Sequence, residues 1–233
     1  IMEVKITEAM TLPLPETEEK SLSSDGLSEI LDFIERRKVD VIVIGPGLST
    51  NRNTGKLVKK ILYRVGLPCI LDADGINLLV GEASLAKAKA EIIMTPHPGE
   101  LGRLLGKKAE EVQRDRISYA SQFSQENNLI CVLKGYQTVV AKGEDVFINP
   151  LGNPGMATGG SGDVLSGMIG GLVAQLRLTE TEKKDSLLSA AIAGVYLHSL
   201  AGDLARREKG EMGLIASDIM EKIPGAIREV LEN

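Results

Sequence analysis

The chain has 233 residues, of which 43% are hydrophobic and 25% charged, and its formal net charge is −5 at pH 7. This length can bury a sizeable core, and the composition excludes disordered and collagen-like proteins. The sequence contains no basic run interleaved with aromatic residues, so we expect no nucleic-acid partner. No apolar run approaches the roughly 20 residues that a membrane-spanning helix needs, so we expect a cytoplasmic protein with no membrane partner.

The first half of the chain alternates amphipathic helical patterns with short, continuous apolar runs. The predicted helices lie over 27–34, over about 53–65 and in stretches that begin near residues 99 and 110. The apolar runs predict strands buried on both faces, over 40–45, 67–72, 91–95 and 129–134. Cys69 and Cys131 lie inside two of these runs, so we expect buried, reduced thiols rather than a disulfide.

After residue 134 the pattern changes. Two runs flank a turn and predict a β-hairpin over 138–148, followed by two long helices lined by apolar residues and a last helix over 217–231. The whole order predicts an α/β fold with a mostly parallel central sheet, flanked by helices on both faces, and a C-terminal β-hairpin region. No linker or repeat interrupts it, so we expect residues 1–233 to form a single domain.

Each of the first four predicted strands runs into a polar, glycine-rich loop. These loops cover residues 45–51, 72–77, 95–100 and 134–138. Ligands of open parallel sheets bind at the carboxyl ends of the strands, where such loops gather. The sequence therefore predicts a binding site along this edge of the sheet.

The strongest single feature is the glycine-rich run 153–163, which leads directly into a predicted apolar helix at Val164. Glycines allow several backbone N–H groups to point the same way, and a helix N-terminus adds partial positive charge, so this arrangement suits a phosphate group. Asp163 in the first helical turn is either a capping residue or a base that takes a proton from an attacking hydroxyl. A carboxylate beside a phosphate cradle costs electrostatic energy, which favours the second interpretation.

Other phosphate and metal motifs are absent from the sequence. No Gly-Lys-Ser/Thr follows at the spacing of a Walker loop, and no GxGxxG follows the first strand. With two histidines and no cysteine pair at ligand spacing, we expect no Cys/His metal site.

The run Gly159–Asp163 resembles the anion hole and catalytic base of ribokinase-like enzymes. Within that superfamily, five motifs in order from about residue 40 to the C-terminus resemble the NAD(P)H-hydrate dehydratases. These motifs are Gly45-Pro46-Gly47-Leu48, Leu71-Asp72-Ala73-Asp74, Thr95-Pro96-His97-Pro98-Gly99-Glu100, Leu133-Lys134-Gly135 and the run from Asn153 to Leu165.

The resemblance implies repair of a damaged nicotinamide cofactor. Hydrated NADH or NADPH (NADHX, NADPHX) would be phosphorylated on its ring hydroxyl and would then lose phosphate, which restores NAD(P)H. The Asn-Pro-Gly-Met-Ala-Thr lead-in resembles the bacterial type, which implies ADP as the phosphoryl donor, AMP as a product, Mg²⁺ as cofactor and ATP as an alternative donor. Two rivals stay open: a hydroxymethylpyrimidine- or hydroxyethylthiazole-type kinase of the same superfamily, and a non-enzymatic nucleotide-binding module.

The resemblance also implies roles for individual residues. Asp163 would be the catalytic base, and the backbone N–H groups of Gly160, Ser161 and Gly162 would stabilise the transferring phosphoryl group. The residues implied for AMP are Lys134, Gly135, Tyr136, Gln137, Thr138 and Gly162. The residues implied for the hydrated dinucleotide are Gly47, His97 and Asp163. Glu100 occupies the position of a glutamate that organises Mg²⁺ in related kinases.

Simpler structural roles remain open for several of these residues. His97 is also suited to cap the helix near Gly99, and Glu100 in a first turn favours the helix dipole in any case. Lys134 at a strand end is also consistent with a solvated side chain. Asp72 and Asp74 are alternatively expected to shape their loop through hydrogen bonds to the backbone, and we expect His198 to have a surface or core role.

The chain departs from the family pattern at two points. A first strand and glycine-rich loop, usual in the family, have no counterpart, and residues 1–14 are predicted to form the strand that comes next. We expect a longer chain, with a fused or partner epimerase domain, rather than loss of that element, because its loss would expose an apolar sheet edge. Ser49 stands where the family usually has glycine. Relatives assemble as tetramers, so the resemblance implies a homo-oligomer.

Overall fold

The computed structural model describes residues 6–82, 84–179 and 186–232. Its centre is a six-stranded sheet in which the strands follow one another in chain order. The strands are β1 (Ile42–Ile44), β2 (Pro68–Leu71), β3 (Glu91–Met94), β4 (Ile130–Leu133), β5 (Val139–Lys142) and β6 (Asp145–Ile148). The first four strands are parallel, whereas β5 and β6 form an antiparallel hairpin. The predicted α/β sheet and its hairpin are therefore confirmed.

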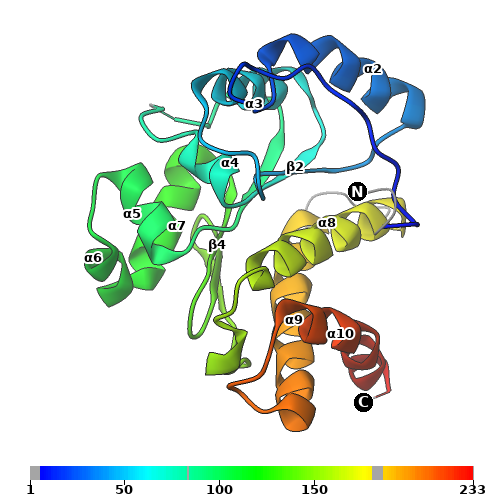
Figure 1. Cartoon of the computed structure of the whole chain (residues 1–233). Coiled ribbons are helices and arrows are strands. Elements are labelled where there is room, and N and C mark those ends of the chain that lie inside the picture. The colour runs from blue at the N-terminus through cyan, green and yellow to red at the C-terminus, as the bar shows by residue number, and fades with distance from the viewer. Residues whose placement is uncertain (1–5, 83, 180–185, 233) are drawn as a thin grey trace.

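Helices cover both faces of the sheet, as the sequence predicted (Figure 1). One face carries α2 (Leu27–Arg37), α3 (Arg52–Arg64), α4 (Asp74–Asn77), α5 (Pro98–Leu105), α6 (Ala109–Arg114) and α7 (Arg116–Asn127). The other face carries α8 (Ser161–Thr179) and α9 (Ser186–Lys209), with α10 (Ala216–Leu231) packed on α9. Two short 3₁₀ turns, η1 (Ser24–Gly26) and η2 (Pro154–Met156), complete the elements.

Strand β2 shows why apolar runs rather than alternating patterns mark these strands. Cys69 and Leu71 pack into the core beneath the first helical layer, whereas Ile70 between them packs against the second layer. Because successive side chains point to opposite faces, a strand covered on both sides needs apolar residues at every position. All residues of β2 and β4 are buried, including Cys69 and Cys131, which are free thiols as predicted.

The strand expected over residues 1–14 is wrong where the structure describes it. Residues 6–14 form no strand, and residues 1–5 lie outside the described part of the chain. Pro13 and Pro15 lack the N–H groups that a strand ladder needs, which explains this difference.

Of the helices in the described ranges, α9 alone is long and apolar enough to cross a membrane by length and composition, although 61% of its apolar window is buried inside the protein.

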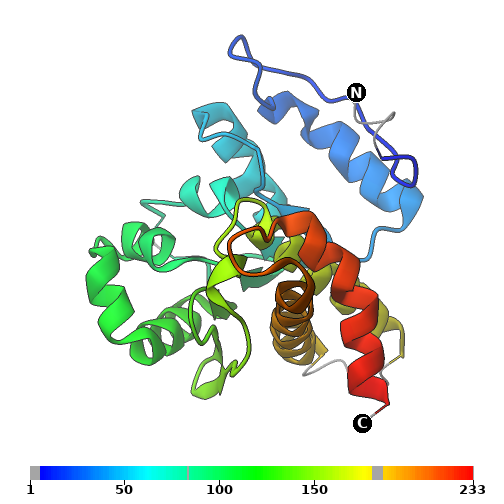
Figure 2. The same cartoon turned by 60° about the horizontal axis from the view of Figure 1, so that its bottom comes forward.

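The carboxyl ends of β1 and β2 approach each other closely at one edge of the sheet. At Gly45 φ is +143°, and an added Cβ would lie only 1.7 Å from the carbonyl oxygen of Asp72. Only glycine allows this approach. The loops after the four parallel strands and the N-terminus of α8 converge at this edge (Figure 2).

Candidate active site

The N-terminus of α8 presents free backbone donors. Gly160 just before it has φ +85°, which lets the chain turn sharply into the helix. Within the described part of the chain, no group accepts a hydrogen bond from the N–H of Gly162 or Asp163. The Asp163 side chain in the same turn is exposed. Unpaired N–H groups and the positive end of the helix dipole form an anion site with a carboxylate at its rim.

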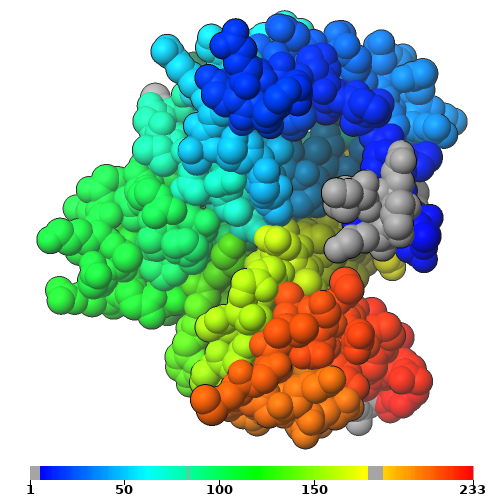
Figure 3. Space-filling model, viewed as in Figure 1, coloured from blue at the N-terminus to red at the C-terminus, as the bar shows by residue number. Residues whose placement is uncertain are grey.

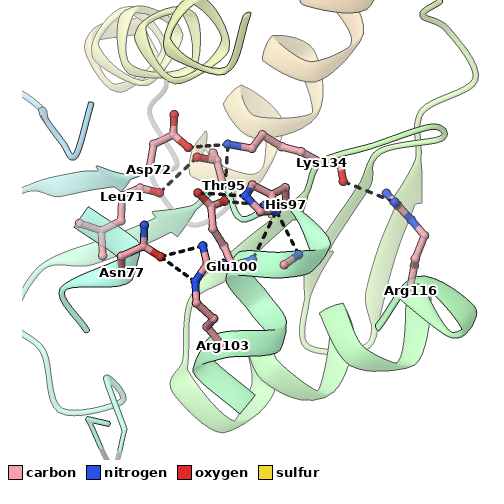
Figure 4. Close-up of polar contacts among 10 residues, drawn as sticks. Leu71, Asp72, Asn77, Thr95, His97, Glu100, Arg103, Arg116 and Lys134 are labelled. Atoms are coloured by element: carbon pink, nitrogen blue, oxygen red, sulfur yellow. Dashed lines mark hydrogen bonds and ion pairs between the residues drawn. The ribbon is translucent and has the colours of Figure 1, made fainter. Parts of the chain in front are cut away.

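Lys134, which follows β4, points directly at this helix end. Its Nζ lies 2.6 Å from Oδ1 of Asp72, which follows β2 and is 1% exposed, and 3.9 Å from Oε2 of Glu100 (Figure 4). A Cβ added to Gly162 would lie 3.3 Å from the same Nζ. The fold therefore places a lysine cation, held by a buried carboxylate, against the N-terminal turn of α8.

His97 and Glu100 form a reciprocal cap at the start of α5. The Nδ1 atom of His97 accepts hydrogen bonds from the N–H groups of Gly99 and Glu100, and Oε2 of Glu100 accepts one from the His97 N–H at 2.7 Å. Nδ1 is therefore the acceptor nitrogen, and the His97 side chain remains half exposed. His97 therefore caps the helix with Nδ1, while the rest of its ring stays accessible to a ligand.

Arg116 of α7 holds the loop 134–138 in place by hydrogen bonds to its backbone. Its guanidinium donates to the carbonyl oxygens of Leu133, Lys134 and Gln137, and burial lowers the pKa of Arg116. At Gly135 φ is +140°, and an added Cβ would lie 2.4 Å from Nη1 of Arg116. The ring of Tyr136 is 82% exposed at the tip. The loop is thus a rigid turn whose outer surface faces solvent.

The loop after β1 is held by Asp74. Its Oδ2 accepts a hydrogen bond from the N–H of Ser49 at 2.9 Å, and Ser49 has φ +63°. Asp74 therefore shapes the neighbouring loop rather than its own, and the expectation for Asp72 is wrong, because its carboxylate accepts from Lys134 instead of the backbone. Serine fits at position 49, where the family usually has glycine. Ala73 has φ +47° and ψ −118°, a conformation that costs a non-glycine residue about 1–3 kcal/mol. Gly47, in the loop after β1, is exposed.

His198 of α9 lies behind the start of α8. It is 5% exposed, and burial lowers its pKa from 6.5 to about 4, opposed by a hydrogen bond with the backbone of Ser161 and reinforced by the charge of Lys134. His198 is therefore neutral at physiological pH and borders the glycine run from inside the protein. Of the two roles expected for it, the structure supports the core role.

The structure brings some of the predicted residues together and leaves others apart. Lys134 lies between Asp72, Gly162 and Glu100, and Glu100 in turn contacts His97. Tyr136, Gln137, Thr138 and Gly47 lie in exposed or half-exposed loops at the same edge of the sheet. Sequence reasoning missed the ion pair of Asp72 and the role of Arg116, since no local pattern marks a partner 62 or 18 residues away.

The arrangement suits transfer of a phosphoryl group. The α8 N–H groups and Lys134 supply positive charge, and the exposed carboxylate of Asp163 lies in the same helical turn. A family model described as NAD(P)H-hydrate dehydratase matches residues 2–225. The chain belongs to this family. Among its members, the bifunctional NAD(P)H-hydrate repair enzyme of Moorella thermoacetica is 43% identical over 234 residues, which cover 100% of this chain. The chain spans 42% of the length of that relative.

Two solved structures share the fold. An ADP/ATP-dependent NAD(P)H-hydrate dehydratase from Bacillus subtilis, co-crystallised with ATP and Mg²⁺, is 32% identical with a TM-score of 0.71 and covers 82% of this chain and 64% of its own. A ribokinase-like superfamily protein from Enterococcus faecalis is 26% identical with a TM-score of 0.76 and covers 98% of this chain and 72% of its own. The ribokinase-like fold expected from the sequence is thereby confirmed.

Proposed function

We propose that the protein catalyses the ADP-dependent dehydration of hydrated NADH or NADPH and releases NAD(P)H, AMP and phosphate. The observation that carries this proposal is the position of Lys134 Nζ, which lies beside Gly162 at the N-terminus of α8, in the same turn as the exposed Asp163. Membership of the dehydratase family supports it.

Asp163 takes the proton of the ring hydroxyl while the hydroxyl oxygen attacks the terminal phosphorus of ADP. The new O–P bond forms while the bond to the AMP oxygen breaks, and the negative charge that spreads over the phosphoryl oxygens is stabilised by the N–H groups of Gly160, Ser161 and Gly162. The N–H of Ser161 exchanges its hydrogen bond with the Thr158 carbonyl oxygen, 3.3 Å away, for the phosphoryl oxygen. Phosphate then leaves with the former hydroxyl oxygen, and loss of a proton from the adjacent ring carbon restores the double bond. Phosphorylation is needed because hydroxide is a poor leaving group.

The two ligands are assigned to opposite sides of Gly162. The AMP portion lies on Lys134, Gly135, Tyr136, Gln137 and Thr138, where the exposed Tyr136 ring offers an aromatic face. The hydrated dinucleotide contacts Gly47, His97 and Asp163, all of which have exposed side chains or backbone at the edge of the sheet.

Mg²⁺ fits this site only together with phosphate oxygens. Within the described ranges, no three His, Cys, Asp or Glu side chains converge as a metal site. Mg²⁺ is commonly held by one or two carboxylates plus substrate phosphates and water, and we assign Glu100 as the carboxylate. When bound, the ion would neutralise charge on the phosphates. Glu100 itself holds the start of α5 and faces Lys134.

We further propose that the catalytic unit is a single domain that acts in the cytoplasm as a homotetramer. Continuous packing of both helical layers on one sheet supports the single domain. Light scattering on the purified chain tests the assembly, and a monomer would contradict it.

The deciding experiment follows NADH formation from NADHX by its near-ultraviolet absorbance, with ADP, with ATP or with no nucleotide. We expect ADP-dependent turnover, AMP in equal amount, and a loss of about 100-fold or more for Asp163→Asn, the scale of a missing general base. A stable phosphorylated product without NADH would instead indicate a small-molecule kinase. Nucleotide binding without any turnover would indicate a binding module.

A further inference from the structure

The loop that leads from β6 into α8 is fastened to one face of α9. Asp203 accepts a hydrogen bond from the N–H of Gly152 on Oδ2 at 3.1 Å and one from Nδ2 of Asn153 on Oδ1 at 2.8 Å. One turn earlier, Ser199 accepts a hydrogen bond from Nδ2 of the buried Asn149 at 2.8 Å. Residues four apart lie on the same face of a helix, so these two contacts act as neighbouring clamps on one loop.

Close packing reinforces the clamps. A Cβ added to Gly202 would lie 2.3 Å from Sδ of Met156, so the η2 turn rests directly on α9 at this glycine. A Cβ added to Gly155 would lie 2.6 Å from the carbonyl oxygen of Glu211 in the connection to α10. Figure 3 shows the yellow-green surface of this loop lying against the orange surface of the α9–α10 region.

The carboxylate of Asp203 is used for the loop rather than for an ion pair. Among the described residues, no lysine or arginine forms an ion pair with Asp203. Both of its oxygens instead accept from the segment 152–153, seven residues before the anion donors begin at Gly160.

We propose that Asp203 is a positioning residue for phosphoryl transfer, because it fixes Gly152 and Asn153 and thereby the glycine run that follows them. Its side chain does not touch the reacting atoms. The inference rests on the proposed function, since the quantity that it controls is the rate of that transfer.

The pairing of Asn153 with Asp203 allows an exchange of the two groups as a test. Asn153→Asp places two carboxylates face to face, and we expect kcat to fall about 100-fold, the scale of a misplacement near 1 Å, while the KM for ADP changes less than about twofold. In the double variant Asn153→Asp with Asp203→Asn, the amide donor and the carboxylate acceptor are exchanged, and we expect at least about tenfold recovery over Asn153→Asp alone. Because one carboxylate of a close pair is easily protonated, the deficit of Asn153→Asp should shrink from pH 8 to pH 6.

Two controls accompany the exchange. Glu208→Gln removes another carboxylate of α9, which pairs with Lys222 away from the loop, and should keep the parental kcat. Asp203→Glu keeps the charge but displaces it by one methylene group, and we expect about a tenfold loss of kcat; it serves as the test if Asn153→Asp folds poorly in thermal melts.

Two results would overturn the role of Asp203 but leave the proposed function standing. One is a parental kcat in both Asn153→Asp and Asp203→Glu. The other is a double variant that is no faster than Asn153→Asp at equal thermal stability. Absence of ADP-dependent turnover in the unaltered chain would overturn the proposed function and the inference with it.

Discussion

Lys134 and Asp72 join the ends of two non-adjacent strands, β4 and β2, through an ion pair of 2.6 Å. The pair lies beside Gly162 in the first turn of α8. The pair therefore adds a polar contact at the first turn of α8, beyond the apolar packing of that helix on the sheet. It also keeps a lysine cation extended at the anion site instead of in solvent.

Removing one partner of this pair should cost more stability than removing both. Lys134→Met leaves the Asp72 carboxylate buried without a cation, and we expect the free energy of unfolding to fall by about 3 kcal/mol. Asp72→Asn with Lys134→Met should recover most of that loss but no NADH formation, because the cation is still missing. Denaturant melts and turnover assays on the same samples measure both effects.

The exposed pair of Lys107 and Glu111, 3.8 Å apart, supplies the control. Lys107→Met should change stability by less than about 1 kcal/mol. Equal stability of the single and double variants at Lys134 would contradict the prediction.

Gly162 tests the anion site by volume alone. In Gly162→Ala the new methyl group would lie 3.3 Å from Lys134 Nζ and 3.6 Å from Oδ2 of Asp72, so we expect the lysine to shift and turnover to drop about tenfold or more. Gly167→Ala on the same helix meets no atom within 4 Å and should raise stability by up to about 1 kcal/mol without loss of turnover. Full activity in Gly162→Ala would show that this space is not used by phosphate.

His198 should make the folded protein sensitive to acid. Its pKa is about 4 in the folded state against 6.5 when exposed, so the unfolded chain binds the extra proton first as the pH falls. The free energy of unfolding therefore keeps its full value with respect to His198 above pH 6.5. It falls between pH 6.5 and pH 4, by about 3 kcal/mol in total.

Denaturant melts at several pH values measure this slope. His198→Gln should flatten it, whereas His97→Asn, which replaces the half-exposed histidine by another good capping residue, should retain it. An unchanged slope in His198→Gln would contradict the assignment.

Gly135 tests the loop assigned to the nucleotide. Gly135→Ala forces a side chain into φ +140° and against Arg116, so we expect the loop to move and the affinity for AMP to fall about tenfold. Gly143→Ala in the hairpin turn, with φ +61° and open space around it, carries a smaller backbone penalty away from the site and should leave AMP affinity unchanged. Isothermal titration compares the two variants.

Most elements of this fold were predictable from local sequence. The apolar run of β2 and the helical spacing of α2 each lie within one segment, and periodicity reports them directly. The glycine run before α8 likewise predicted an anion site, because glycines and a helix start together produce free backbone N–H donors within one short segment. Residues 6–14 were the exception: the strand expected there followed from the family pattern, and the chain forms none around Pro13.

Side-chain partners across the fold were not predictable in this way. Asp72 finds Lys134 62 residues later, and Asn153 finds Asp203 50 residues later. Nothing in the neighbourhood of either residue encodes those distances.

The sequence by itself determined which segments become strands and helices, where the anion-binding turn lies and to which family the motifs correspond. Only the tertiary structure decided that Asp72 holds Lys134, that Arg116 supports the loop 134–138 and that Asp203 of α9 binds Gly152 and Asn153. The physical reason is that backbone preferences and hydrophobic periodicity act over a few residues. The partner of a buried charge, in contrast, is chosen by the packing of the whole chain.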